Sequence, residues 1–179
     1  FHWDMAHLGP WNKDADRRFG DGPMAVPGTY QARITIGGNS STASFDLMVD
    51  PRVTEQGVNV TDIVAQTELQ GHISELLSKS RKLEEEAKAE HGALHRQYSG
   101  QSNEERGDAA NAEFDRVHAA VRALGTPNII YPKAMLSGMI RYLYNINSDA
   151  DQKPGKDSIN RLAELSAQYD LVEAAYRSK

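Results

Sequence analysis

Histidine is the residue type in this sequence best suited to chemistry, because an imidazole can bind a metal ion or transfer a proton near neutral pH. The chain holds six histidines, and His91 and His95 are four apart in a segment with helical periodicity, which places both side chains on one helix face. The HExxH pattern of zinc hydrolases is absent, since Gly92 stands where the glutamate belongs. A second pair, His2 and His7, has only proximity in its favour. We interpret these histidines as packing or exposed residues and predict no metal site; a metal-dependent enzyme built on either pair is the less favoured alternative.

Motifs for other kinds of catalysis are missing as well. The absence of cysteine excludes a thiolate nucleophile, a disulfide framework and a cysteine-ligated zinc. There is no phosphate-binding glycine loop and no GxSxG nucleophile motif. The segment SDADQKPGKD, residues 148–157, resembles a calcium loop in having Asp149 and Asp151 two apart, but it lacks the glycine and the twelfth-position glutamate of an EF-hand. The sequence therefore predicts a protein that is not an enzyme and that holds no cofactor.

Charge and hydropathy exclude two classes of partner. The net charge of −5 is spread along the chain, and no basic stripe is present that would neutralise phosphates, so we expect no nucleic acid partner. No run approaches the roughly 18 apolar residues of a membrane span, so we expect no span in this chain.

The amino-terminal third has the period of β-strands. From Thr29 to Ile36 apolar and polar residues alternate, GGN at residues 37–39 suits a hairpin turn, and alternation resumes from Ala43 to Val49. Tyr30 follows a Pro-Gly turn, a position similar to the tyrosine corner of immunoglobulin-like domains, where the hydroxyl bonds back to nearby backbone; an ordinary core tyrosine is the alternative.

These strands are too few for a complete sandwich. Residues 1–5, FHWDM, are expected to form a third short strand, whereas residues 6–25 are rich in Gly, Pro and charge and are expected to form a loop. A sandwich of the immunoglobulin type needs about seven strands. We therefore predict a partial antiparallel β-sandwich of about three strands, with an uncovered apolar face and at least one open edge.

The rest of the chain has the period of helices. Apolar residues recur at spacings of three and four in a long segment of residues 61–98, with Thr61 as the expected N-cap, and again in residues 110–124, 133–147 and 157–177. Short polar loops between them predict an up-and-down bundle of three to four helices; pairing with a helix of a partner is the alternative. The expected fold is α+β, with an incomplete immunoglobulin or fibronectin-like β module in residues 1–53 and a helical bundle in residues 54–179.

Several stretches together, FHWDM, VPGTYQARITIGG, FDLMVDPRV and SDADQKPGKDSINRLAEL, resemble the carboxy-terminal region of large bacterial exported proteins of the sortilin type, also called BNR-repeat or glycosyl-hydrolase-like proteins. The resemblance covers nearly all of the chain. It implies an immunoglobulin-like or fibronectin-like module and a helical tail that follow a β-propeller, further strands ahead of Phe1, and export to the periplasm or the cell exterior. The Asp-box repeats of the propeller are missing from this sequence, so the resemblance assigns no catalytic residue here.

These observations lead to the expectation of a non-catalytic interaction module. Its open β part would dock on a protein partner, by β-augmentation, in a larger exported or membrane-associated assembly. Such a partner could be a transport, respiratory or photosynthetic multisubunit complex, contacted at its periplasmic face. An accessory domain of an exported BNR-repeat hydrolase is the alternative. The candidate interaction residues are Trp3, Trp11, Tyr30, Ile34, Phe45 and Leu47.

Overall fold

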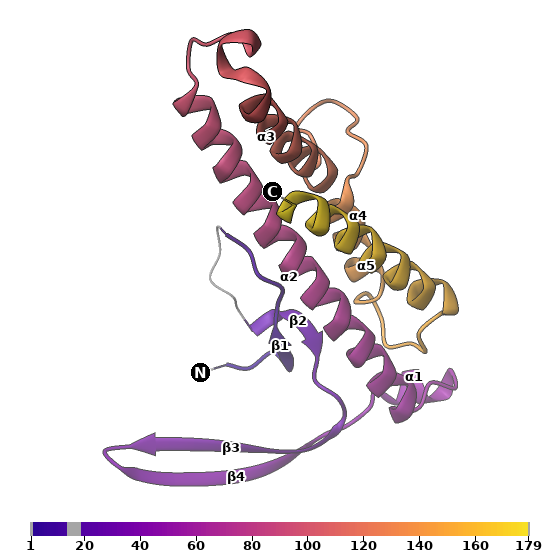
Figure 1. Cartoon of the computed structure of the whole chain (residues 1–179). Coiled ribbons are helices and arrows are strands. Elements are labelled where there is room, and N and C mark those ends of the chain that lie inside the picture. Colours follow the sequence, from indigo (N-terminus) through magenta and orange to yellow (C-terminus); the bar gives the residue numbers. More distant parts are fainter. Residues whose placement is uncertain (1, 14–18, 179) are drawn as a thin grey trace.

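The computed structural model describes residues 2–13 and 19–178 and has a mixed α+β fold (Figure 1). In chain order, the elements are β1 (Ala6–Leu8), β2 (Phe19–Met24), β3 (Gly28–Ile36), β4 (Asn39–Leu47), α1 (Pro51–Glu55), α2 (Val60–Gln97), α3 (Asn103–Leu124), α4 (Leu136–Ile146) and α5 (Lys156–Arg177). The predicted order, strands followed by helices, is confirmed.

The strands form two separate sheets, so the expected single sheet of about three strands is wrong. β1 pairs with β2, β3 pairs with β4, both antiparallel, and no strand in the described residues joins the two pairs. The expected strand at residues 1–5 is wrong for residues 2–5: β1 starts only at Ala6, after Met5 with a φ of 62°, and residue 1 lies outside the described residues. Both β1 and β2 lie in residues 6–25, the segment expected to be a loop, so that expectation is wrong. The two strands pair because Gly22 allows a close backbone approach: a Cβ at this position would lie 2.3 Å from the carbonyl oxygen of His7.

The β1–β2 sheet packs on α2 and not on the β3–β4 hairpin. Ala6 and Ala25 are buried there, and the backbone N–H of Ala25 donates to the carbonyl of Met5 over 2.7 Å. The hydroxyl of Thr67 on α2 donates to the carbonyl of Met24 over 3.4 Å. The small sheet therefore belongs to the helical body.

The change from strands to helices falls at Asp50 and Pro51. Asp50 caps the short helix α1, where its side chain accepts a hydrogen bond from the backbone N–H of Arg52 over 2.9 Å. Hydrogen bonds from the Arg52 side chain and backbone lower the pKa of Asp50 to about 2. The sequence predicts the first helix only from residue 61, so α1 was missed, and the predicted division between residues 53 and 54 falls inside α1.

α2 is the longest element, with 38 residues, as its apolar period predicts. Its N-cap is Asn59, and the expected cap at Thr61 is wrong by two residues. Asn59 and Asp62 form a capping box, in which each side chain accepts from the other's backbone N–H. The predicted apolar stripe is confirmed, since the following residues on it are buried: Leu69, Ile73, Leu76, Ser80, Leu83, Ala87 and Leu94.

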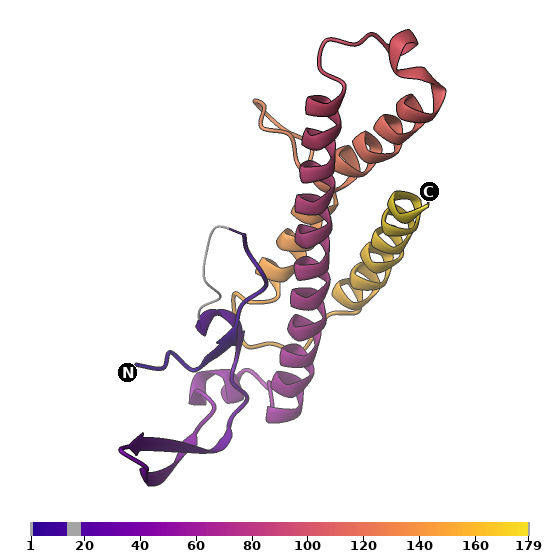
Figure 2. The same ribbon diagram turned by 60° about the vertical axis from the view of Figure 1, so that its left-hand side comes forward.

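α3 and α4 lie end to end along α2 and run in the same direction, so the predicted alternation of up and down helices is wrong at α4 (Figures 1 and 2). His118 on α3 contacts His91. Ser137 on α4 contacts Ser80, and Asn147, the C-cap of α4, contacts Gln70, which is closer to the start of α2. α5 runs back parallel to α2, and its last turns reach Glu90 and Glu86. A single 38-residue helix is long enough to be covered by two shorter ones in succession.

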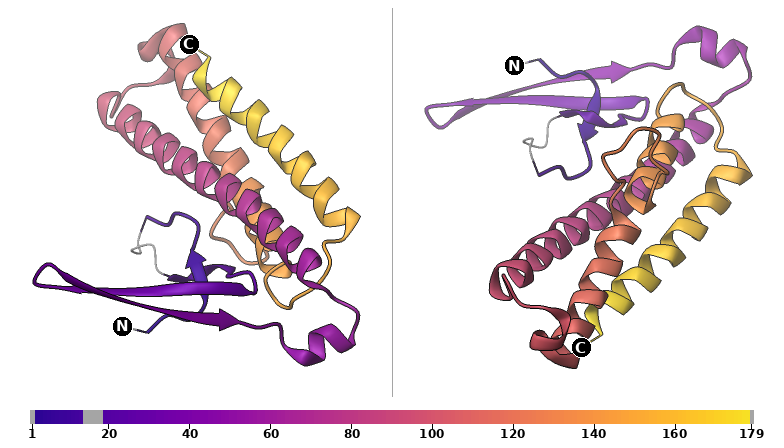
Figure 3. Two further views of the ribbon diagram at one scale, coloured as in Figure 1. Left: turned by 90° about the horizontal axis from the view of Figure 1, so that it is seen from below. Right: turned by 90° about the horizontal axis from the view of Figure 1, so that it is seen from above.

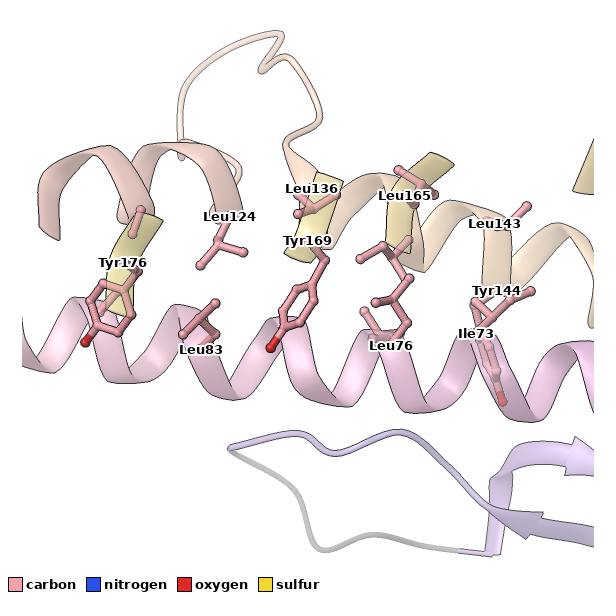
Figure 4. Close-up of a cluster of buried hydrophobic side chains, with 14 of the residues drawn as sticks. Ile73, Leu76, Leu83, Leu124, Leu136, Leu143, Tyr144, Leu165, Tyr169 and Tyr176 are labelled. Carbon is pink, nitrogen blue, oxygen red and sulfur yellow. The ribbon is translucent and has the colours of Figure 1, made fainter. Parts of the chain in front are cut away.

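One apolar core lies between these four helices (Figure 4). Ile73, Leu124, Ile140 and Leu165 come from different helices and each is 0% exposed. The buried hydroxyl of Ser80 has a partner, since it lies 2.8 Å from the hydroxyl of Ser137. No residue of β3 or β4 belongs to this core among the described residues.

Candidate functional site

The candidate site is the β3–β4 hairpin, residues 28–47, which we call the arm. It extends from the helical body, as Figures 1 and 3 show. Among the described elements β3 and β4 contact only each other. Each strand therefore has one edge whose backbone N–H and C=O groups meet no other strand of the described chain.

The pairing register gives the arm two different faces. Residues directly opposite each other in an antiparallel pair point to the same side. Tyr30 and Phe45 therefore share one face of the arm, and Thr29 and Asp46 share the other. The polar face is held by side-chain hydrogen bonds, such as the 2.6 Å bond from Thr29 to Asp46. The face with Tyr30, here called the apolar face, also contains Ala32, Ile34, Ile36, Ala43 and Leu47.

Trp3 contacts the base of the apolar face. Its ring centroid lies 5.5 Å from that of Tyr30 and 6.2 Å from that of Phe45, while Tyr30 and Phe45 stack at 5.9 Å. The Trp3 indole N–H donates to the Ala6 carbonyl over 3.0 Å, which ties this cluster to β1. The Tyr30 hydroxyl donates to the carbonyl of Val26 over 2.6 Å, which agrees with the tyrosine-corner interpretation, one of the two that the sequence left open.

The outer half of the apolar face is open. Ile34 is 65% exposed and Ile36 is 75% exposed. The only charged residues of the arm, Arg33 and Asp46, both lie on the polar face and cancel. The arm therefore presents Ile34 and Ile36 as an uncharged, apolar strip along β3, opposite the uncharged polar Ser41 and Asn39 of β4. Exposed apolar strips are typical of interaction surfaces.

The structure brings most of the predicted interaction residues together. Trp3, Tyr30 and Phe45 form the cluster at the base, and Ile34 and Leu47 share its face. Trp11 lies elsewhere: its backbone N–H donates to the Ser78 hydroxyl over 2.9 Å, and its carbonyl accepts from Arg81 over 3.0 Å, both on α2. Ile36 was missed as a site residue, although the alternation that marked Ile34 extends to it.

A second cluster joins α2 to α3. His91 stands between His95, at a ring distance of 4.5 Å, and His118, at 5.2 Å, and the Nε2 of His91 lies 3.3 Å from the Nδ1 of His118. Arg106 and Phe114 line the same pocket, and the Arg106 guanidinium lies 4.5 Å from the centre of the Phe114 ring. No group of three or more His, Cys, Asp or Glu side chains in the described residues is arranged to hold a metal ion.

Stability should respond to pH through this cluster. Burial lowers the pKa of His91, and the neighbouring His95 and His118 lower it further. The unfolded chain then binds more protons than the folded one below the ordinary histidine pKa of about 6.5, so the free energy of unfolding should fall as pH decreases through about 6.5. We expect at most about 1 kcal/mol, because water screens this largely open site. Urea unfolding at neutral and mildly acidic pH measures it.

Two histidine variants test the origin of this pH dependence. His118→Asn removes one of the imidazoles beside His91 and should reduce the loss of stability in acid. His72→Asn, at an exposed position of α2, the helix that carries His91, should leave that loss unchanged. Equal pH dependence in the wild type and the His118→Asn variant would rule out His118 as one of its sources.

The remaining candidate residues either lie in a loop that is held by hydrogen bonds or are exposed. In the loop with Asp149 and Asp151, the Gln66 amide donates to the Ala150 carbonyl over 2.7 Å and accepts from the Gln152 N–H over 2.9 Å. Gln66 is 4% exposed, so these bonds fasten the loop to α2. His2 and His7 are both exposed.

Comparison with known proteins adds no relative. In the described part of the chain, none of the helices has both the length and the hydropathy needed to cross a membrane. No protein family model, no curated protein and no solved structure matches this chain.

Proposed function

We propose that this protein is a non-catalytic interaction module that docks on a protein partner through the arm. The observation that supports the proposal is the apolar face of the arm, whose outer half, with Ile34 and Ile36, is exposed and touched by no other strand or helix of the described chain. An isolated two-stranded hairpin is marginally stable in water, so a covering partner would stabilise the arm.

The exposed strand edges and the apolar face of the arm favour a partner rich in β-structure. Its edges offer backbone donors and acceptors to an added strand, and its apolar face suits the alternating apolar side chains of a second sheet. Its two charges cancel and lie on the other face, so main-chain hydrogen bonds and apolar contacts, and not ion pairs, would provide the affinity.

The location of the partner is a further part of this proposal. We place it in an exported or membrane-associated multisubunit complex, of the transport, respiratory or photosynthetic kind, at the periplasmic face. The support is the resemblance of the sequence to sortilin-type exported proteins. A cross-linked partner from the cytoplasm would contradict this location.

Site-specific photo-cross-linking in the native host tests the docking. A photoreactive amino acid at position 34, on the apolar face, should cross-link to one protein, and the same amino acid at position 35, on the polar face, should not. Against the identified partner, Ile34→Asp should lower the affinity at least about tenfold, because it places an unpaired carboxylate in an apolar contact, while Thr35→Asp should change it little.

Three outcomes would contradict the proposal. Equal cross-linking from positions 34 and 35 would show that the apolar face is not the contact. Cross-links between two copies of the chain would replace the partner with self-association. A native protein whose intact mass includes a propeller would favour the accessory domain of a hydrolase.

A further inference from the structure

The connection between α3 and α4 is a loop whose two ends are joined by a hydrogen bond. At its base the Thr126 hydroxyl accepts a hydrogen bond from the backbone N–H of Met135 over 3.1 Å. Within it the N–H of Ile129 donates to the Pro127 carbonyl over 3.1 Å, and Pro132 fixes a further φ angle. Closed surface loops of this length are frequently functional. Figure 2 shows this orange loop projecting to the upper left of α2.

The tip of this loop is apolar and almost fully exposed. Ile129 is 63% exposed, Ile130 85% and Tyr131 94%. Tyr131 has a φ of 55°, in the left-handed region that bulky residues rarely adopt. Three adjacent large apolar side chains, held outward on a closed loop, are more than the scattered exposure of an ordinary surface.

The segment of the chain that carries the tip has a charge opposite to that of the whole chain. Residues 125–148 contain no Asp or Glu, and their only charged residues are Lys133 and Arg141, although the chain has a net charge of −5. The basic residue next to the tip is Lys133, two positions after Tyr131 and exposed. An apolar tip beside a lysine complements an anionic surface.

We propose that this tip, Ile129 to Tyr131, inserts into the interface of an anionic lipid bilayer, with Lys133 at the level of the phosphates. Isoleucine side chains enter the acyl boundary, tyrosine prefers the interfacial region where its ring is apolar and its hydroxyl hydrated, and lysine reaches back to the headgroups. A protein partner fits less well, because a standard protein interface buries about 800 Å² on each side and three side chains at a loop tip offer much less. The inference is independent of the docking proposed for the arm.

Vesicle sedimentation of the full chain tests the inference. The chain should bind vesicles of phosphatidylcholine with phosphatidylglycerol more tightly than vesicles of phosphatidylcholine alone. Ile130→Asp should lower the partition coefficient by about tenfold, because it removes apolar contact and adds a repelled charge. Thr35→Asp, the same change in charge on the arm, should have little effect. Lys133→Gln should weaken binding to the anionic vesicles and leave binding to the neutral ones unchanged.

A fluorescent label reports insertion directly. The chain has no cysteine, so Ile130→Cys gives one labelling position, and Thr35→Cys is the matched control on the arm. An environment-sensitive dye at position 130 should shift to shorter wavelength when anionic vesicles are added, and the dye at position 35 should not. Circular dichroism of each variant checks that the helices are intact.

Three results would overturn the inference: no binding of the wild type to anionic vesicles, equal binding of the wild type and the Ile130→Asp variant, or no shift of the dye at position 130 on vesicles. A shift at position 130 that appears only when a purified protein partner is added would also overturn it, in favour of protein docking at this loop.

Discussion

Replacing Leu165 with alanine is expected to lower the free energy of unfolding by about 2–5 kcal/mol, the cost of removing a buried leucine and leaving a cavity. Leu165 is 0% exposed and lies on α5 in the core shared by the four long helices (Figure 4). The cost should be near the upper end if the surrounding side chains, Leu76 among them, cannot move into the space. Equilibrium unfolding in urea, followed by circular dichroism, measures the change.

Leu171→Ala is the matched control for this prediction. It makes the same change on the same helix, but Leu171 is 73% exposed, so the effect should stay within about 0.5 kcal/mol. If both variants lost the same stability, burial of Leu165 would not account for the loss, and α5 would not be packed as described.

Replacing Glu90 with alanine is expected to lower the free energy of unfolding by about 1–3 kcal/mol, because it leaves part-buried donors without their acceptor. Glu90 on α2 accepts from Arg116 on α3 over 2.8 Å and from the hydroxyl of Tyr176 on α5. Tyr176 is 3% exposed, and the Arg116 side chain is 16% exposed. One carboxylate thus connects three helices.

Glu86→Ala is the control for this second prediction. Glu86 pairs with Arg177, and Glu86 lies one turn before Glu90 on α2, but both side chains are about half exposed, so the loss should be at most about 1 kcal/mol.

The titration of Tyr176 is a second measurement on the Glu90→Ala variant. Burial raises the pKa of Tyr176 above its usual range and the hydrogen bond to Glu90 raises it further, so Glu90→Ala should lower that pKa. An unchanged titration would show that the Tyr176 hydroxyl does not bond to Glu90.

Features with a local physical cause could be predicted from the sequence. The recurrence of apolar residues at spacings of three and four marked α2 and its buried stripe, since the side chains of one helix face are set by the helix period alone. The alternation on both sides of GGN predicted the β3–β4 hairpin. The turn is a local property too, since a tight hairpin turn needs positive φ and Gly37 and Gly38 both adopt it. The N-cap of α2 was missed by two residues, since Asn59 and Thr61 are both residue types that cap helices.

Features that depend on residues far apart in the sequence could not be predicted. β1 and β2 are joined by backbone pairing across a segment without a strand period. His118 lies 27 residues after His91, and only the packing of α3 on α2 brings them into contact. The direction of α4 depends on the path of the loop at residues 125–135. An apolar stripe predicts that one face of a helix is buried, but it does not identify the helix that packs against that face.

The arm shows both sides of this division. The sequence by itself determined that Tyr30, Ile34 and Phe45 share one apolar face, because side chains alternate along every extended strand. Only the tertiary structure decided how that face is covered. Trp3 packs on its base, while the β1–β2 sheet, which could have completed it, lies on α2 and leaves Ile34 open. The physical reason is that alternation fixes the direction of a side chain relative to its own strand, whereas burial depends on what the rest of the chain places against it.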